Sequence, residues 1–285
     1  MSRARRVIVA LLAVVALGVA SAAVAVDRIL TPSGDGEMRT FLLLGSDEGP
    51  MRSENPLRGR ADGVQLLFVS GDRQHATFVS IPRDAYMPVP GRGTTRLSHC
   101  LVDGPANCVT TVEQEFGISV DGYLVTSMHG FARGVNSFGG LTVDVSGPVF
   151  DGGHDIPQAG MQDLSGMQAL TYARDRTHRP GGDFTRSQAQ ARLLAIAHRE
   201  VVESGDLRRA LDAIRAVRSH TVTDLSGQQL AHLGFEALRL PPGNVERVLA
   251  PGQHGSAGGM AIVRLQPRAY ELINDAAADG RIGTG

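Results

Sequence analysis

Two aspartates and one arginine are predicted to meet at one edge of a β-sheet. Asp47 directly follows an apolar run (FLLLGSD), Asp62 precedes the next one (RADGVQLLFVS), and Arg83 follows a third. A turn at residues 71–73 (GDR) would return the third run to the same edge. Carboxylate oxygens beside a phosphate suit Mg²⁺, which retains water and phosphate oxygens. Either aspartate alone would indicate a turn or a strand cap. Together with Arg83 they predict a site for a metal ion and an anion.

More arginines surround a glycine-rich turn further along the chain. Arg174 and Arg176 precede the segment PGGDFTR, which ends at Arg186 near the start of a predicted helix. A helix N-terminus offers free N–H groups and the positive end of the helix dipole to an anion. Arg186 and Gln190, at positions i and i+4, fall on the inward face of this helix, where a charged side chain needs a partner. The pattern predicts a phosphate or pyrophosphate site.

The absence of lysine limits the chemistry that the chain can use. All 28 basic residues are arginines, so a Walker-type loop cannot form, and the motifs HExxH, paired CxxC and GxSxG do not occur. A net charge of −1 provides no overall field for nucleic acid, so no nucleic-acid partner is expected. Phosphate contacts must therefore come from guanidinium groups, backbone amides or helix ends.

Strands and helices alternate over the first part of the chain. Runs of branched apolar residues predict strands at 40–44, 64–70, 76–81, 122–126 and 141–145. Helical patterns occupy residues 106–116 and 127–138, which indicates an α/β domain with a central mixed β-sheet flanked by helices in three layers.

The second half is predicted to contain mainly helices. Ser/Thr-x-x-Gln patterns at Ser165 and Thr185 predict two helix starts, and the second helix should reach residue 203. Beyond Gly205 the sequence predicts a helix at 207–217, a strand at 261–265 and a final helix from Pro267.

An uncharged stretch at residues 7–26 is long enough to cross a bilayer as a helix. Three arginines precede it, which predicts a cytoplasmic segment at 1–6, a tether at 27–37 and an extracytoplasmic domain at 38–285, anchored in the cell membrane by a single pass. A cleaved signal peptide is the alternative, because residues 20–22 (ASA) and 23–25 (AVA) resemble cleavage sites. Either arrangement exports the domain.

Cys100 and Cys108 are the two cysteines of the chain, and both follow the proposed anchor. Disulfides persist outside the cytoplasm, so a disulfide between them is predicted. Two small buried thiols are the alternative.

Several segments together resemble the LytR-CpsA-Psr (LCP) family of cell-envelope proteins. They are FLLLGSD, RADGVQLLFVS, SIPRDAYMPVPG, FGGLTVDV, LSGMQALTYARDR and GGDFTRSQAQ, in the family's order over about residues 41–190. The resemblance implies transfer of a glycopolymer from a polyprenyl pyrophosphate carrier to a peptidoglycan acceptor. A phosphodiester forms and polyprenyl phosphate leaves. It also implies Mg²⁺ as cofactor, one N-terminal membrane helix and an apolar pocket for the lipid.

The resemblance also assigns roles to the residues of both clusters. Asp47 and Asp62 match the metal-associated aspartates of the family. The positions that match its pyrophosphate site are Arg83, Arg174, Arg176, Arg186 and Gln190. The four arginines are the catalytic candidates, since they would stabilise charge that develops on the pyrophosphate.

Several positions depart from the family pattern, among them Ser98, which replaces a common asparagine. Ala61 and Gly63 replace hydroxyl-bearing residues around Asp62, while Thr185 and Ala189 replace a glycine and a frequent second arginine. These departures leave two alternatives open. One is a polyprenyl pyrophosphate hydrolase, in which water replaces the acceptor, and the other is a non-catalytic membrane protein that binds the lipid carrier or glycan.

Overall fold

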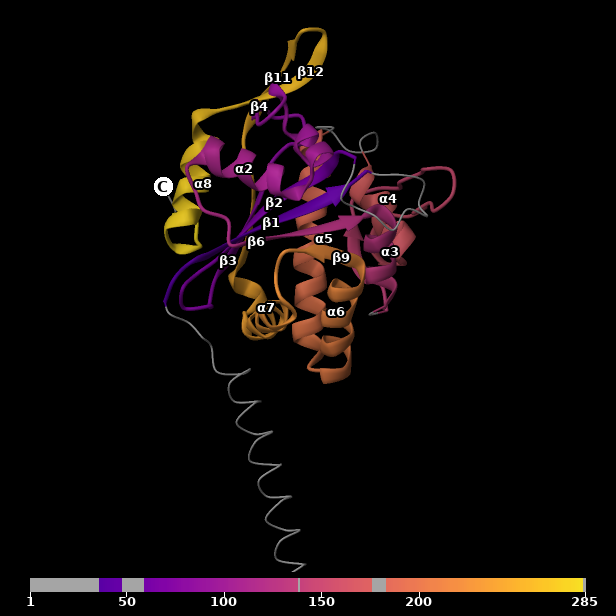
Figure 1. Ribbon diagram of the computed structural model, residues 1–285. Helices are drawn as coiled ribbons and strands as arrows, with labels where there is room; N and C mark the ends of the chain where they lie inside the picture. Colours follow the sequence, from indigo (N-terminus) through magenta and orange to yellow (C-terminus); the bar gives the residue numbers. More distant parts are fainter. Residues whose placement is uncertain (1–35, 48–58, 138, 176–182, 284–285) are drawn as a thin grey trace, which may run out of the picture.

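A mixed six-stranded sheet forms the centre of the computed structural model, which describes residues 36–47, 59–137, 139–175 and 183–283 (Figure 1). The strand order is β10-β3-β2-β1-β6-β9. β1 is antiparallel to β2 and parallel to β6, and β3 is antiparallel to β2 and parallel to β10. The strands are β1 (Arg39–Ser46), β2 (Ala61–Val69), β3 (Ala76–Ser80), β6 (Gly122–Ser127), β9 (Thr221–Thr223) and β10 (Val245–Leu249). β1, β2, β3 and β6 confirm the strands predicted at 40–44, 64–70, 76–81 and 122–126.

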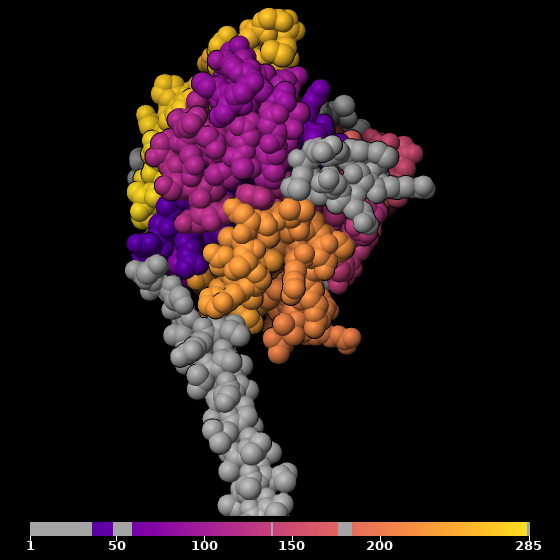
Figure 2. All heavy atoms as spheres, viewed as in Figure 1, coloured from indigo at the N-terminus to yellow at the C-terminus, as the bar shows by residue number. Residues whose placement is uncertain are grey.

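Helices cover both faces of this sheet, as predicted. One face carries the 3₁₀ helix η1 (Leu97–Asp103), α2 (Pro105–Phe116) and α8 (Pro267–Asp279). The other layer consists of α3 (Met128–Ser137), α4 (Gly166–Arg174), α5 (Asp183–Ser204), α6 (Leu207–His220) and α7 (Gly227–Arg239). α5 lies against β2, β3 and β10. In Figure 2, α6 and α7 (orange) form one lobe next to the surface made by η1 and α2 (magenta).

Three two-stranded hairpins lie outside the central sheet. They are β4 (Tyr86–Val89) with β5 (Gly93–Arg96), β7 (Leu141–Val145) with β8 (Gly160–Leu164), and β11 (Gly252–Ala257) with β12 (Met260–Leu265). A short 3₁₀ helix, η2 (Pro242–Asn244), precedes β10. The predicted strand at 141–145 is present, but its partner is β8 rather than a strand of the sheet. Strand patterns identify a strand and not its partner, because pairing depends on residues distant in sequence.

The two faces of the sheet differ in how tightly they are filled. On the η1, α2 and α8 side, Leu66, Phe68 and Val79 are fully buried in the largest core cluster. On the opposite side, Leu43 and Leu67 are only partly buried. A further cluster joins β7 and β8 to α4 and α5.

Capping boxes were predicted to begin two helices, at Ser165 and at Thr185. At α4, Ser165 Oγ accepts from the Gln168 amide (3.4 Å) and Gln168 Oε1 accepts from the Ser165 amide (3.1 Å), which confirms the first box. The second prediction is wrong, because α5 begins at Asp183 and Thr185 lies inside it. Phe184, which lies in α5 before Thr185, packs its ring against His254 with the centroids 4.9 Å apart. This contact joins residues distant in sequence, so a local pattern cannot predict it. The same Ser-x-x-Gln pattern at Ser226 begins α7.

Cys100 and Cys108 form a disulfide with an S–S distance of 2.09 Å, which ties η1 to α2. The predicted cytoplasmic segment 1–6, the span 7–26 and most of the tether 27–37 lie outside the described residues. Within the described ranges, no helix has the length and apolarity needed to span a membrane.

Candidate active site

A β-bulge places Asp62 at the rim of the sheet. Gly45 pairs with Gly63 and Ser46 pairs with Ala61, so Asp62 is an extra residue on β2. Bulges redirect a side chain at the end of a strand pair. One carboxylate oxygen of Asp62 forms an ion pair with Arg83, and the other lies 4.0 Å from Nη1 of Arg186. The predicted meeting of Asp62 and Arg83 is therefore confirmed, and Arg186 of α5 joins them, which was not predicted.

Backbone hydrogen bonds fix the segment that carries Arg83. The Ile81 amide donates to the Val64 carbonyl (3.0 Å), and the Ser98 amide donates to the Arg83 carbonyl (2.8 Å). The next residue, Asp84, has a carboxylate oxygen 3.6 Å from Nε of Arg83 and 3.6 Å from Nη1 of Arg96. The guanidinium of Arg83 is thus oriented by carboxylates on two sides.

A buried polar network holds α5 against the sheet. Ser80 Oγ donates to Oε1 of Gln65 (2.7 Å), and Nε2 of Gln65 donates to the Ser187 carbonyl (3.2 Å). Arg186, the residue before Ser187, has only 2% of its side chain exposed. Its predicted inward orientation is confirmed. The network fixes the register of α5 against the sheet and so sets where the backbone of Arg186 lies.

Gln190 lies on the same face of α5, one turn after Arg186. Its Nε2 donates to the Asp62 carbonyl at 3.4 Å. A Cβ on Gly63 would come within 2.7 Å of Gln190 Oε1, so a larger residue here would make the end of the Gln190 side chain move.

Asp47 closes the end of the β1–β2 pair. Its Oδ1 accepts from the Arg60 amide (2.5 Å), and its own amide donates to the Arg60 carbonyl (2.9 Å). Asp47 and Asp62 thus offer hard oxygen atoms at the ends of adjacent strands. No cluster of three or more metal-ligating side chains occurs within the described ranges. Two carboxylates nonetheless fit Mg²⁺, because this ion commonly takes only one or two from the protein.

The positive field at this rim also acts on a histidine. His99 of η1 shares a hydrogen bond with Thr95 (2.9 Å). Its pKa is lowered by burial and then by the charges of Arg96, Arg60 and Arg92. The lowered pKa keeps His99 uncharged at neutral pH, so the positive charge at this rim comes from the arginines.

The remaining arginine candidates are less constrained. Arg174 is the last residue of α4 and is exposed, whereas Asp175, directly after it, is buried. Arg176 lies outside the described residues. The roles of Arg174 and Arg176 in binding an anion stay predictions.

The residues that position the site were not predicted from the sequence. Gln65 and Ser80 are polar residues within apolar strands, and that contrast was the available signal. The strand predicted at 261–265 is confirmed as β12, whereas its hairpin partner β11 was not predicted. The hairpin supports the Arg83 segment through a hydrogen bond from the Val263 amide to the Asp84 carbonyl (2.7 Å). Arg264 on the same hairpin lies over the Tyr86 ring, 5.8 Å from its centroid.

Comparison with known proteins identifies similar sequences. The profile of the LytR_cpsA_psr family matches residues 21–277. The polyisoprenyl-teichoic acid–peptidoglycan teichoic acid transferase TagU of Oceanobacillus iheyensis is 32% identical over 200 residues, which cover 68% of this chain and 61% of the relative. TagU of Enterococcus faecalis is 29% identical over 199 residues, covering 69% of this chain and 65% of the relative. The chain therefore matches less than two thirds of the length of either relative.

A solved structure shares the fold. The LytR-Csp2A-Psr enzyme from Actinomyces oris superposes with a TM-score of 0.69 and 25% sequence identity. The match covers 87% of this chain and 92% of that chain.

Proposed function

This chain belongs to the LytR-CpsA-Psr family, and we propose that it transfers a glycopolymer from a polyprenyl pyrophosphate carrier to peptidoglycan. The observation that carries the proposal is the contact of Asp62 with both Arg83 and Arg186. Two guanidinium groups from different elements are held by one carboxylate, so their positions are set before a pyrophosphate arrives. Such preorganised charge is the main source of catalysis when charge develops on phosphate oxygens.

In the proposed reaction, a hydroxyl oxygen of a peptidoglycan sugar attacks the phosphorus atom that carries the glycopolymer. The bond between this phosphorus and the bridging oxygen breaks, and polyprenyl phosphate leaves with the electron pair. The hydroxyl proton is lost as the phosphodiester forms. Arg83 and Arg186, together with Arg174 and Arg176, would stabilise the charge on the departing phosphate. A loose transition state needs little help from a base.

Asp84 acts in this scheme as a positioning residue. Its carboxylate lies between Arg83 and Arg96, 3.6 Å from each guanidinium nitrogen. The carboxylate thus holds the guanidinium groups of Arg83 and Arg96 in place from one side. We therefore assign Asp84 to the orientation of Arg83 and leave the general base unassigned.

Mg²⁺ would be held by Asp47 and Asp62. When bound, it would neutralise charge on the phosphate oxygens. The support is the donor set, two carboxylates at adjacent strand ends, one hydrogen-bonded to a backbone amide and the other paired with arginines.

The prenyl chain is assigned to the sheet face beneath α7. Leu43 and Leu67 lie on this face in the middle of the sheet and are partly buried, as are Leu225 and Leu233. These side chains pack against the buried Phe41 and Val69 and keep part of their apolar surface accessible, which would contact the prenyl chain. Proximity to the Asp62 rim would let the lipid and its pyrophosphate bind together.

The proposed location is outside the cell membrane, with residues 7–26 as a single-pass anchor. The disulfide between Cys100 and Cys108 supports an oxidising compartment. The relatives from Oceanobacillus iheyensis and Enterococcus faecalis are described as teichoic acid transferases. An anionic glycopolymer is therefore the first donor to test.

The test incubates the full chain, in detergent, with a polyprenyl pyrophosphoryl saccharide, peptidoglycan fragments and Mg²⁺, and follows the products by mass spectrometry. A phosphodiester-linked saccharide–peptidoglycan product that requires Mg²⁺ would support the proposal. Cleavage of the pyrophosphate without a larger product would indicate the hydrolase instead. Intact lipid that co-purifies with the protein would indicate a binding protein.

A further inference from the structure

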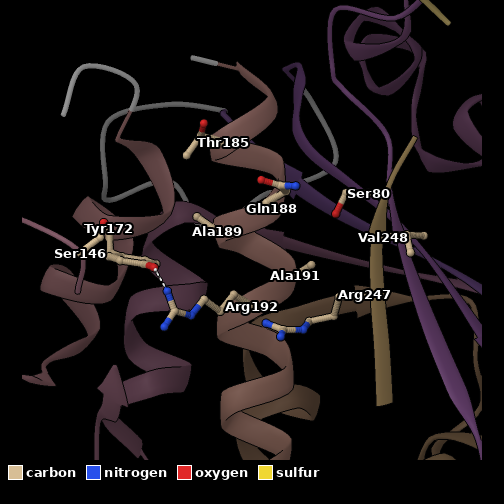
Figure 3. A pocket seen from close by; sticks show the side chains of 10 residues that line it. All are labelled: Ser80, Ser146, Tyr172, Thr185, Gln188, Ala189, Ala191, Arg192, Arg247 and Val248. Carbon is tan, nitrogen blue, oxygen red and sulfur yellow. Dashed lines mark hydrogen bonds between the residues drawn. The ribbon is translucent and has the colours of Figure 1, made fainter. Parts of the chain in front are cut away.

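A cavity of about 330 Å³ lies beside α5, between α4 and β10 (Figure 3). This volume is within the range of small-ligand sites. Arg192 of α5 and Arg247 of β10 line it from two sides, with Tyr172 of α4 and the polar residues Ser146 and Gln188. In Figure 3, Arg247 extends from the strand towards the helix and Arg192 extends from the helix towards Tyr172. Its walls are therefore mainly polar and cationic.

The positive charge of this cavity is poorly compensated. Nη1 of Arg192 donates to the Tyr172 hydroxyl at 3.0 Å, whereas Nη2 lies 3.9 Å from Asp144, whose side chain is 64% exposed. An exposed pair at that distance contributes little. Arg247 makes no ion pair or hydrogen bond with any residue that the structure describes. Burial lowers the pKa of Arg247, and the charges of Arg192 and Arg199 lower it further. The cavity therefore has a local excess of positive charge.

The cavity adjoins the candidate active site across α5. Thr185 and Ala189 line it, and each directly precedes a site residue, Arg186 and Gln190. Arg192 follows Arg186 by six residues, or about 9 Å along the helix, and points to a different side. A short saccharide attached at the pyrophosphate site could pass the start of α5 and reach the cavity.

We propose that the cavity formed by Arg192, Arg247 and Tyr172 binds an anionic sugar unit of the glycan on which the neighbouring site acts. This inference rests on the proposed function. Two guanidinium groups bind a phosphate or carboxylate through paired charge-assisted hydrogen bonds. The hydroxyl and amide groups of Ser146 and Gln188 suit sugar hydroxyls. The anion could be a phosphate of the donor polymer or a muramyl carboxylate of the acceptor.

The test measures binding of small anionic sugars to the full chain by calorimetry. The probes are N-acetylglucosamine 6-phosphate and N-acetylmuramic acid, with uncharged N-acetylglucosamine as the ligand control. Arg247→Gln and Arg192→Gln should each weaken binding of an anionic sugar about ten- to a hundredfold, the effect of losing a charged hydrogen-bond donor. Arg199→Gln removes an exposed arginine of the same helix whose charge also acts on Arg247 but which does not line the cavity, and should weaken binding far less than either cavity variant.

The comparison of probes separates the two sources of the anion. Tighter binding of the sugar phosphate indicates the donor polymer, and tighter binding of the muramic acid indicates the acceptor. Equal binding of the uncharged sugar, or equal losses in Arg247→Gln and Arg199→Gln, would overturn the proposal.

A second measurement separates this inference from the proposed function. In the transfer assay, Arg247→Gln should raise KM for the substrate that carries the anion about tenfold or more and leave kcat nearly unchanged, because Arg247 is assigned to binding alone. Binding of a polyprenyl pyrophosphate without glycan should not change. If anionic sugars bind in a way that depends on Arg247 but the chain makes no transfer product, the transferase proposal is refuted and the sugar-binding proposal stands. Transfer with an unchanged KM in Arg247→Gln would refute the cavity alone.

Discussion

Leu66 and Leu67 are neighbours on β2, yet they occupy very different surroundings. Leu66 is fully buried among the residues that η1, α2 and α8 cover, whereas Leu67 faces the α5–α7 layer and is only partly buried. The packed face also contains the disulfide, and the other face contains the buried Arg186 and the polar network of Gln65. One sheet thus has a face filled for stability and a face that holds charge and space for a ligand.

The largest expected effect concerns the charge on the ligand-facing side. Arg186→Gln should lower kcat for transfer on the order of 10²–10³-fold, the cost of removing one preorganised donor from developing charge. Arg199→Gln, which removes an exposed arginine of the same helix, should have little effect. Steady-state kinetics checks this pair, with thermal melting to show that both variants fold. Similar losses in both variants would contradict the assigned role of Arg186.

Leucine truncation compares the two faces directly. Leu66→Ala should lower the free energy of unfolding by about 3 kcal/mol, because it leaves a cavity in a filled core. Leu67→Ala should cost about 1 kcal/mol, since its side chain already contacts accessible space. Denaturant unfolding at constant pH measures both values. If Leu67→Ala costs as much as Leu66→Ala, the α5–α7 face is a filled core and the lipid assignment fails.

Removal of the disulfide tests whether the face covered by η1, α2 and α8 contributes to stability rather than to transfer. The double variant Cys100→Ser, Cys108→Ser should lose about 2–3 kcal/mol of unfolding free energy, from the loop-closure entropy of a short loop. Its transfer activity at a temperature where it stays folded should be retained. A reductant should destabilise the wild type to the same extent and leave the double variant unchanged, and a different response would indicate free thiols.

The smallest predicted effect is a change with pH in the free energy of unfolding, caused by His198 on the ligand-facing side. Burial lowers the pKa of His198 below its usual 6.5, partly opposed by a hydrogen bond with the Ala237 carbonyl. The unfolded chain then binds more protons than the folded one. The stability that this difference provides is present above pH 6.5 and is lost as the pH falls. Unfolding free energies at pH 7.5 and 5.5 should differ less in His198→Gln than in the wild type. An unchanged difference would show that His198 is not the titrating group.

The site was predictable to the extent that its parts are close in sequence. β1, β2 and β3 are successive antiparallel neighbours, so local turns were enough to bring Asp62 and Arg83 together. The burial of Arg186 followed from its spacing to Gln190 on one helix. The bulge at Asp62 was not predictable, since it depends on the register between two strands.

Parts of the molecule that are positioned by contacts between residues far apart in the sequence could not be predicted in the same way. β10 joins the edge of β3 in parallel from the far end of the chain, and this pairing, with α5 packed on β10, places Arg247 and Arg192 at one cavity. The first residues of α5 include Phe184, whose ring packs against His254, also far away in sequence. Local patterns contain no information on either contact.

The most direct test of the central claim compares two arginines in the transfer reaction. Arg83 contacts Asp62 at the rim, while Arg92 forms an exposed ion pair with Asp103. With polyprenyl pyrophosphoryl saccharide, peptidoglycan fragments and Mg²⁺, Arg83→Ala should make no detectable phosphodiester product, and Arg92→Ala should make nearly as much as the wild type. Equal activity in the two variants would contradict the placement of the pyrophosphate at this rim.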